Sequence, residues 1–197
     1  LAEGKIIDEE ASLSFEKDNS GYAITKFEAE MEVWRGSQEG VPVVIVNPGI
    51  ILGAGFWEKG SGALFTKIDR GLWFYSQGIT GFVGVKDVVD IMIGLMKSDI
   101  CNERFIVVSE NKSFKEIFFS IADHMGKKRP TIKVTKLLSE IGWRIDKIKT
   151  LVLNGEPLLT VHSAKSIHAK KHYSSEKVKN WLKFDFESIN TTIERVC

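Results

Sequence analysis

A helical stretch that leads directly into an apolar strand constrains the fold of this chain most strongly. Apolar residues recur at three- and four-residue steps from Ile24 to Trp34, which predicts an amphipathic helix ending near Gln38. An apolar strand over residues 43–47 follows Gly40, as expected for a parallel strand covered on both faces. A helix that runs into such a strand is typical of α/β proteins with a parallel sheet.

Two residues near the N-terminus of the predicted helix are candidate catalytic residues. Tyr22 and Lys26 are four residues apart, so they share one helix face and lie about 6 Å apart along its axis. A lysine ammonium at that spacing favours the ionised phenol, and such a tyrosine can act as a general acid or base near neutral pH. The spacing alone is not specific, because Tyr173 and Lys177 repeat it. Only the first pair precedes a strand that ends in the turn Asn47-Pro48-Gly49-Ile50-Ile51-Leu52-Gly53, where backbone can approach a ligand closely.

These motifs, followed by Phe82-Val83-Gly84-Val85-Lys86-Asp87-Val88, occur in an order that resembles the extended short-chain dehydrogenases/reductases. The resemblance is to the epimerase/dehydratase branch, with its dihydroflavonol-reductase-like members closest, and it covers nearly the whole chain. It implies an NAD(P)-dependent oxidoreductase or epimerase that acts on an alcohol or carbonyl, such as a nucleotide sugar, ketone or aldehyde. It also implies a homodimer in which the first helix packs against its mate.

The resemblance assigns roles to particular residues. Tyr22 would exchange the hydroxyl proton while a hydride moves to or from the nicotinamide. Lys26 would hold the nicotinamide ribose hydroxyls and keep the phenol acidic. The residues that contact NAD or NADP would be Tyr22, Lys26, Asn47, Pro48, Gly49 and Ile51.

Two features of the family have no counterpart in this sequence. No glycine fingerprint of the kind that joins the first strand to a helix is identified, although that turn holds the dinucleotide pyrophosphate at a helix N-terminus. None of the upstream serines stands at a strand end, so none is assigned the family's catalytic serine role. We therefore expect the C-terminal part of a longer protein, inactive as a fragment. The alternative is a non-catalytic member that uses the fold for binding or assembly.

The predicted fold class is α/β. Residues 1–110 are expected to form the C-terminal part of a Rossmann-type doubly wound sheet, with a substrate-side insertion over residues 53–81. Residues 111–197 are expected to form a small, mostly helical substrate-side subdomain. The predicted strands after the first are 72–75, 81–85 and 104–108. The second predicted helix covers residues 63–70, and the third is capped by Asp87 and turns Val88, Ile91, Met92 and Leu95 inward. Further helices are predicted from the capping box at Ser113 to Gly126, from Thr135 to Gly155, and from Ser188 onward.

Charge is distributed unevenly along the chain. Residues 1–126 carry 12 basic and 19 acidic side chains, whereas residues 127–197 carry 15 basic and 7 acidic ones. The basic residues alternate with apolar ones at helical spacing, which favours a solvated face over a nucleic-acid site.

Other ligands and compartments are disfavoured by composition. His162, His168 and His172 lie close in sequence, but their neighbours are lysines and serines, so no metal site is predicted. Cys101 and Cys197 are expected to be free thiols in a reducing cytoplasm. The most apolar run, residues 41–57, is interrupted by Asn47, Pro48 and glycines, so no membrane span is expected.

Overall fold

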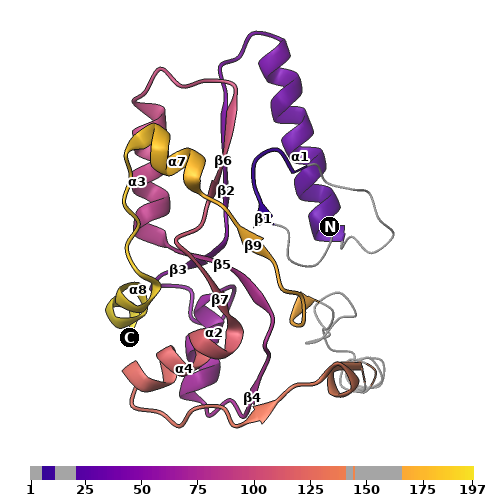
Figure 1. The fold of residues 1–197 in the computed structure, drawn as a ribbon, viewed down its shortest axis with the longest axis vertical. Helices are drawn as coiled ribbons and strands as arrows, with labels where there is room; N and C mark the ends of the chain where they lie inside the picture. The colour runs from indigo at the N-terminus through magenta and orange to yellow at the C-terminus, as the bar shows by residue number, and fades with distance from the viewer. Residues whose placement is uncertain (1–5, 12–20, 141–143, 145–165) are drawn as a thin grey trace.

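The structure is a computed structural model that describes residues 6–11, 21–140, 144 and 166–197. Strands and helices alternate through most of the described chain (Figure 1). The strands are β1 (Ile6–Ile7), β2 (Val44–Pro48), β3 (Ile50–Leu52), β4 (Phe74–Tyr75), β5 (Ile79–Gly84), β6 (Glu103–Val107), β7 (Glu110–Ser113), β8 (Ile132–Lys133) and β9 (His172–Tyr173). The helices are α1 (Gly21–Gln38), α2 (Gly62–Asp69), α3 (Val85–Met96), α4 (Phe114–His124), α7 (Glu176–Leu182) and α8 (Ile189–Val196).

Strands β2 and β6 form a parallel pair with a helix on each face (Figure 1). Side chains alternate along a strand, so one face of the pair is apolar and packs on α3. That buried cluster contains Val83, Val88, Ile91, Leu95, Phe105, Val107 and Val178, with Val44 and Val46 packed against it. The opposite face presents Asn47 and Arg104 to α1, through hydrogen bonds that fix the helix to both strands.

A second sheet and three helices enclose the other part of the core. Strand β5 pairs in parallel with β3 and antiparallel with β7. Helices α2, α4 and α8 cover this sheet around Leu52, Phe65, Ile68, Phe82, Ile117, Ile121, Ala122, Ile189 and Ile193. Full burial of one such side chain contributes about 1.5–3 kcal/mol, so this cluster and the one under α3 stabilise the described fold.

The two edges of the β2–β6 pair differ. Beside β6, the Glu9 carboxylate accepts a hydrogen bond from the Ile106 amide, and the Ser175 hydroxyl accepts one from the Val108 amide. Strand β1, just before Glu9, pairs in parallel with β9. Along the far edge of β2, no strand of the described residues pairs. One edge is therefore covered and the other is open within the described part of the chain.

The structure confirms the α/β class and most of the predicted elements. The first helix ends at Gln38 as predicted, and the helix predicted over 63–70 is α2. The predicted capping box is present, because the Ser113 hydroxyl accepts from the Glu116 amide and the Glu116 carboxylate accepts from the Ser113 amide. Ser188 caps α8 through its hydroxyl. Of the helix predicted from Thr135 to Gly155, residues 136–140 are helical, and most of the remainder lies outside the described residues.

Two expectations about α3 were wrong. The residue at its N-cap is Gly84, and Asp87 lies inside the first turn, where its buried carboxylate accepts a hydrogen bond from the Glu187 amide. Met92 was expected to face inward, but 47% of its surface is exposed. A contact from the C-terminal segment, 100 residues away in sequence, determines the role of Asp87, and helical periodicity cannot reveal it.

Helix α1 also differs from its predicted packing. None of its residues is buried, and Met31 of the predicted apolar stripe is 40% exposed. The apolar stripe of α1 therefore packs only partly against the described core. Hydrogen bonds of polar side chains are then expected to help to position the helix.

Candidate active site

Tyr22 and Lys26 lie on the first two turns of α1. The helix runs antiparallel to the strand it precedes, so its N-terminus lies toward the carboxyl end of β2 (Figure 1). In open α/β sheets, that end of the strands is where ligands bind. The Tyr22 side chain is 77% exposed, and neither residue hydrogen-bonds to a side chain of the described chain. Phenol and ammonium therefore share an exposed helix face on the ligand side.

The other residues expected at the site form the bend between β2 and β3. Pro48 ends β2 and is exposed, and Ile51 lies in β3 with its carbonyl accepting a hydrogen bond from the Ser61 hydroxyl. The Gly49 amide donates to the Val107 carbonyl at 3.0 Å. A Cβ at Gly49 would lie 2.5 Å from the Gly81 carbonyl oxygen. The close backbone approach at this glycine is thus to the protein's own strand β5.

Asn47 faces α1 rather than the bend. Its side-chain amide nitrogen donates to Glu30 Oε2 at 3.3 Å. Glu30 is eight residues beyond Tyr22, which corresponds to about 12 Å along a helix axis. The Asn47 side chain is therefore engaged roughly two turns away from the phenol.

The second Tyr-x-x-x-Lys sequence does not form a comparable pair. Tyr173 is in β9 and Lys177 is in α7, so the two do not share a helix face. Burial raises the pKa of the Tyr173 phenol, which opposes its use as a base. The Lys177 ammonium binds the Glu103 carboxylate at 2.7 Å and lies over the Phe105 ring. The structural context separates the two sequence matches.

Two of the three histidines that the sequence groups together, His168 and His172, lie within the described residues. His168 Nε2 and the Ser139 hydroxyl are 2.9 Å apart, and burial, with the nearby Lys136 charge, lowers the pKa of His168. His172 is in β9, and His162 lies outside the described residues. No cluster of metal-ligating side chains is found among the residues that the structure describes. Cys101 and Cys197 are free thiols and both are exposed, as expected.

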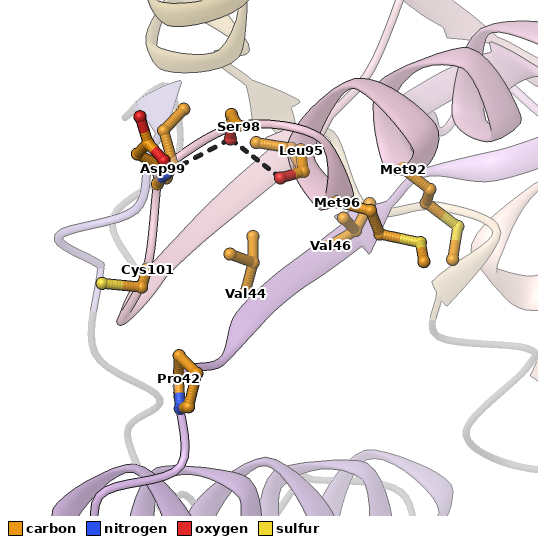
Figure 2. A pocket seen from close by; sticks show the side chains of 10 residues that line it. Pro42, Val44, Val46, Met92, Leu95, Met96, Ser98, Asp99 and Cys101 are labelled. Atoms are coloured by element: carbon orange, nitrogen blue, oxygen red, sulfur yellow. Dashed lines mark hydrogen bonds between the residues drawn. The ribbon is translucent and has the colours of Figure 1, made fainter.

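A pocket of about 490 Å³ lies on the other side of β2 (Figure 2). Its lining is mostly apolar and comprises Pro42, Val44, Val46, Met92, Leu95, Met96, Ser98, Asp99, Ile100 and Cys101. Val44 and Val46 point to the face covered by α3, whereas Asn47 points to α1. The pocket contains none of the predicted site residues, so we place the candidate site at the N-terminus of α1.

Sequence reasoning missed Glu30 and Arg104, which connect the site elements. Glu30 continues the series Tyr22, Lys26 at the same four-residue step, so it shares their helix face. Arg104 and Glu103 are charged residues at the start of a strand that is otherwise apolar, which is the local signal of paired charges.

Comparisons with known proteins agree with the fold. Residues 2–104 match the NAD-binding family described as male sterility protein. No curated protein matches the chain. No helix in the described ranges is long and apolar enough to cross a membrane.

Solved structures share the fold at low sequence identity. The structure of gox2253 is 22% identical with a TM-score of 0.76, and the match covers 98% of this chain and 59% of that one. The structure of PA4631, a nucleoside-diphosphate-sugar epimerase from Pseudomonas aeruginosa, is 19% identical with a TM-score of 0.72, covering 93% and 56%. A dTDP-glucose 4,6-dehydratase from Bacillus anthracis, in complex with NAD, is 16% identical with a TM-score of 0.70, covering 100% and 56%. The chain thus spans less than two thirds of the length of these relatives.

Proposed function

Because the chain belongs to the NAD-binding family described as male sterility protein, within the extended short-chain dehydrogenases/reductases, we propose that it contributes the acid–base part of an NAD(P)-dependent oxidoreductase or epimerase. The observation that carries the proposal is the Tyr22–Lys26 pair, exposed on one face of α1 at the carboxyl end of the parallel strands. NAD or NADP, as expected from the sequence, is the cofactor of such a protein.

The residues present fit the nicotinamide end of that cofactor. The Lys26 ammonium forms no ion pair within the described residues, so its three donors are available to ribose hydroxyls. The backbone of Pro48, Gly49 and Ile51 lies at the end of β2, where it can line the ring. When bound, NAD(P) supplies the hydride acceptor or donor.

The chain's own residues handle the proton. Tyr22 Oη takes the proton of a substrate hydroxyl during oxidation and returns it to the carbonyl oxygen during reduction. Lys26 holds the ribose hydroxyls through its ammonium donors. The site acts on an alcohol or carbonyl, and the nucleotide-sugar enzymes among the structural relatives support a nucleotide sugar over a simple ketone or aldehyde.

The surface supports proposals about assembly and location. We propose a homodimer through α1, because no residue of this helix is buried and its apolar stripe is half-exposed. A cytoplasmic location suits two exposed free thiols. A non-catalytic binding or assembly role is the second candidate, favoured by the edge of β2, which pairs with no strand of the described residues and lies beside an apolar pocket.

Replacing Tyr22 with Phe distinguishes the two candidates. In a protein that also carries the pyrophosphate-binding part, Tyr22→Phe keeps the ring and removes the proton, so turnover should fall about 10²–10⁴-fold with cofactor binding largely kept. Steady-state rates at saturating cofactor measure this. Tyr173→Phe is the matched control and should be near neutral. A Tyr22→Phe rate within a few-fold of wild type would remove Tyr22 from the mechanism.

A further inference from the structure

Three hydrogen-bond donors from three elements converge on one carboxylate. Glu30 Oε1 accepts from Arg104 Nη1 at 3.2 Å and from Trp34 Nε1 at 3.3 Å, and Oε2 accepts from Asn47 Nδ2 at 3.3 Å. The Glu30 side chain is 17% exposed and that of Arg104 is 30% exposed, so solvent only partly replaces these contacts. A half-buried guanidinium that loses its carboxylate is left without charge compensation.

Arg104 extends the cluster to residues 9–11. Its Nε donates to the Glu9 carbonyl at 2.9 Å, and Nη2 donates to the Ala11 carbonyl at 3.2 Å. The hydrogen bonds of this cluster therefore connect residues 9–11, α1, β2 and β6. Since α1 has no buried residue, we expect these polar contacts to contribute to where the helix lies.

We infer that Glu30 is a positioning residue, whose carboxylate binds Asn47 and Arg104 and so holds α1, with Tyr22 and Lys26, at the carboxyl ends of β2 and β6. The inference assigns Asn47 to this support rather than to cofactor contact. Its part concerning Tyr22 and Lys26 rests on the proposed function. The contacts of Glu30 themselves do not.

Reversing the donor and acceptor roles tests the pair. Asn47→Asp places a second carboxylate against Glu30 and removes the donor, so the two like charges should displace α1. Adding Glu30→Gln restores the pairing, because the new amide donates to the new carboxylate while its oxygen still accepts from Arg104 and Trp34. The total charge of the pair then equals that of the wild type. Asn47→Asp with Glu28→Gln carries the same charge but leaves Glu30 unchanged, since Glu28 is exposed on the same helix.

Two measurements on the 197-residue chain read out the contacts without any activity. The indole N–H signal of Trp34 in ¹H–¹⁵N spectra, assigned through Trp34→Phe, should shift in Asn47→Asp and return in the Glu30→Gln double variant. Unfolding in denaturant should follow the same order, with the Glu28→Gln combination as impaired as Asn47→Asp alone.

Turnover in a protein with the complete dinucleotide site gives the functional readout. Asn47→Asp should lower kcat about tenfold or more by misplacing α1, with little change in the KM for cofactor, and Glu30→Gln should restore kcat. Recovery of the Trp34 signal without any turnover in wild type would support the positioning contacts and reject the proposed function. If Asn47→Asp raises the KM for cofactor and adding Glu30→Gln does not lower it again, the inference is overturned, because Asn47 would then contact the cofactor.

Discussion

At the residue scale, Lys26 is the group proposed to hold the cofactor next to Tyr22. Lys26→Met keeps the length of the side chain but removes the charge and its donors. We expect weaker NAD(P) binding and slower turnover, because the ribose hydroxyls lose their partner.

Equilibrium titration of cofactor and steady-state rates check both effects. Lys177→Met is the matched control for the second sequence match. It should lower stability through the lost ion pair with Glu103 and leave cofactor binding by the folded protein unchanged. An unaltered cofactor dissociation constant together with unaltered turnover in Lys26→Met would refute the proposed role.

Individual residues differ in how well the sequence predicts them. Tyr22 and Lys26 share a helix face because of spacing alone, and the structure keeps them on one. The bond between Asn47 and Glu30 joins residues 17 apart on a strand and a helix, and only the tertiary packing of α1 on β2 creates it. Local sequence assigned Asn47 to the cofactor and could not identify Glu30 as a competing partner for its side chain.

At the scale of elements, helix α4 depends on its N-terminal cap. Ser113→Ala removes the hydroxyl that accepts from the Glu116 amide, and we expect a loss of about 1 kcal/mol in the free energy of unfolding. Urea denaturation measures the change. Ser120→Ala, farther along the same helix, removes a hydroxyl without touching the cap and should cost less. Equal losses in the two variants would argue against the cap.

The same cap predicts a pH dependence. Hydrogen bonds from the Ser113 hydroxyl and amide lower the pKa of Glu116 below its usual value. A carboxyl group whose pKa is depressed in the folded state stabilises the protein above its unfolded pKa, and this contribution disappears as pH falls through the folded pKa. The difference in stability between wild type and Ser113→Ala should therefore shrink in acid. A difference that is constant from neutral pH into acid would contradict the role of the Glu116 carboxylate.

Elements defined by local signals were predicted well, and those defined by distant contacts were not. The capping box of α4 and the end of α1 follow from neighbouring residues. Asp87 in α3 was predicted as a cap, but its carboxylate binds the Glu187 amide, and burial raises its pKa. The extended backbone of Gly84 begins α3 without a side-chain cap, for which the sequence gives no signal.

At the scale of the whole molecule, apolar surface gathers on the open side of β2. The pocket beside that strand is continuous with α3, because Met92 and Met96 line it (Figure 2). Exposed apolar residues continue along the helix at Val85, Val89, Met92, Ile93 and Met96. An unpaired strand edge next to an apolar surface recruits further chains.

We therefore expect the 197-residue chain to self-associate. Light scattering over a concentration series should give a molar mass that rises above that of the monomer. Met96→Lys places a charge on the exposed stripe, where 83% of the methionine is accessible, and should reduce the association without unfolding the chain. If the chain stays monomeric at every concentration, this exposed apolar surface does not drive self-association.

The central claim is that this chain supplies the acid–base residues of an NAD(P) site but not the part that binds the pyrophosphate. Strand β2 leads through Gly49 into β3, not into a helix N-terminus, and the one Gly-x-x-Gly-x-x-Gly spacing in the sequence, at Gly78, Gly81 and Gly84, runs along strand β5 rather than through a turn. Calorimetric titration of the 197-residue chain with NAD and with NADP tests this most directly. The account predicts no saturable binding in the micromolar range for either dinucleotide. Micromolar binding by a well-behaved monomer would contradict it, because residues 1–197 would then build the whole site.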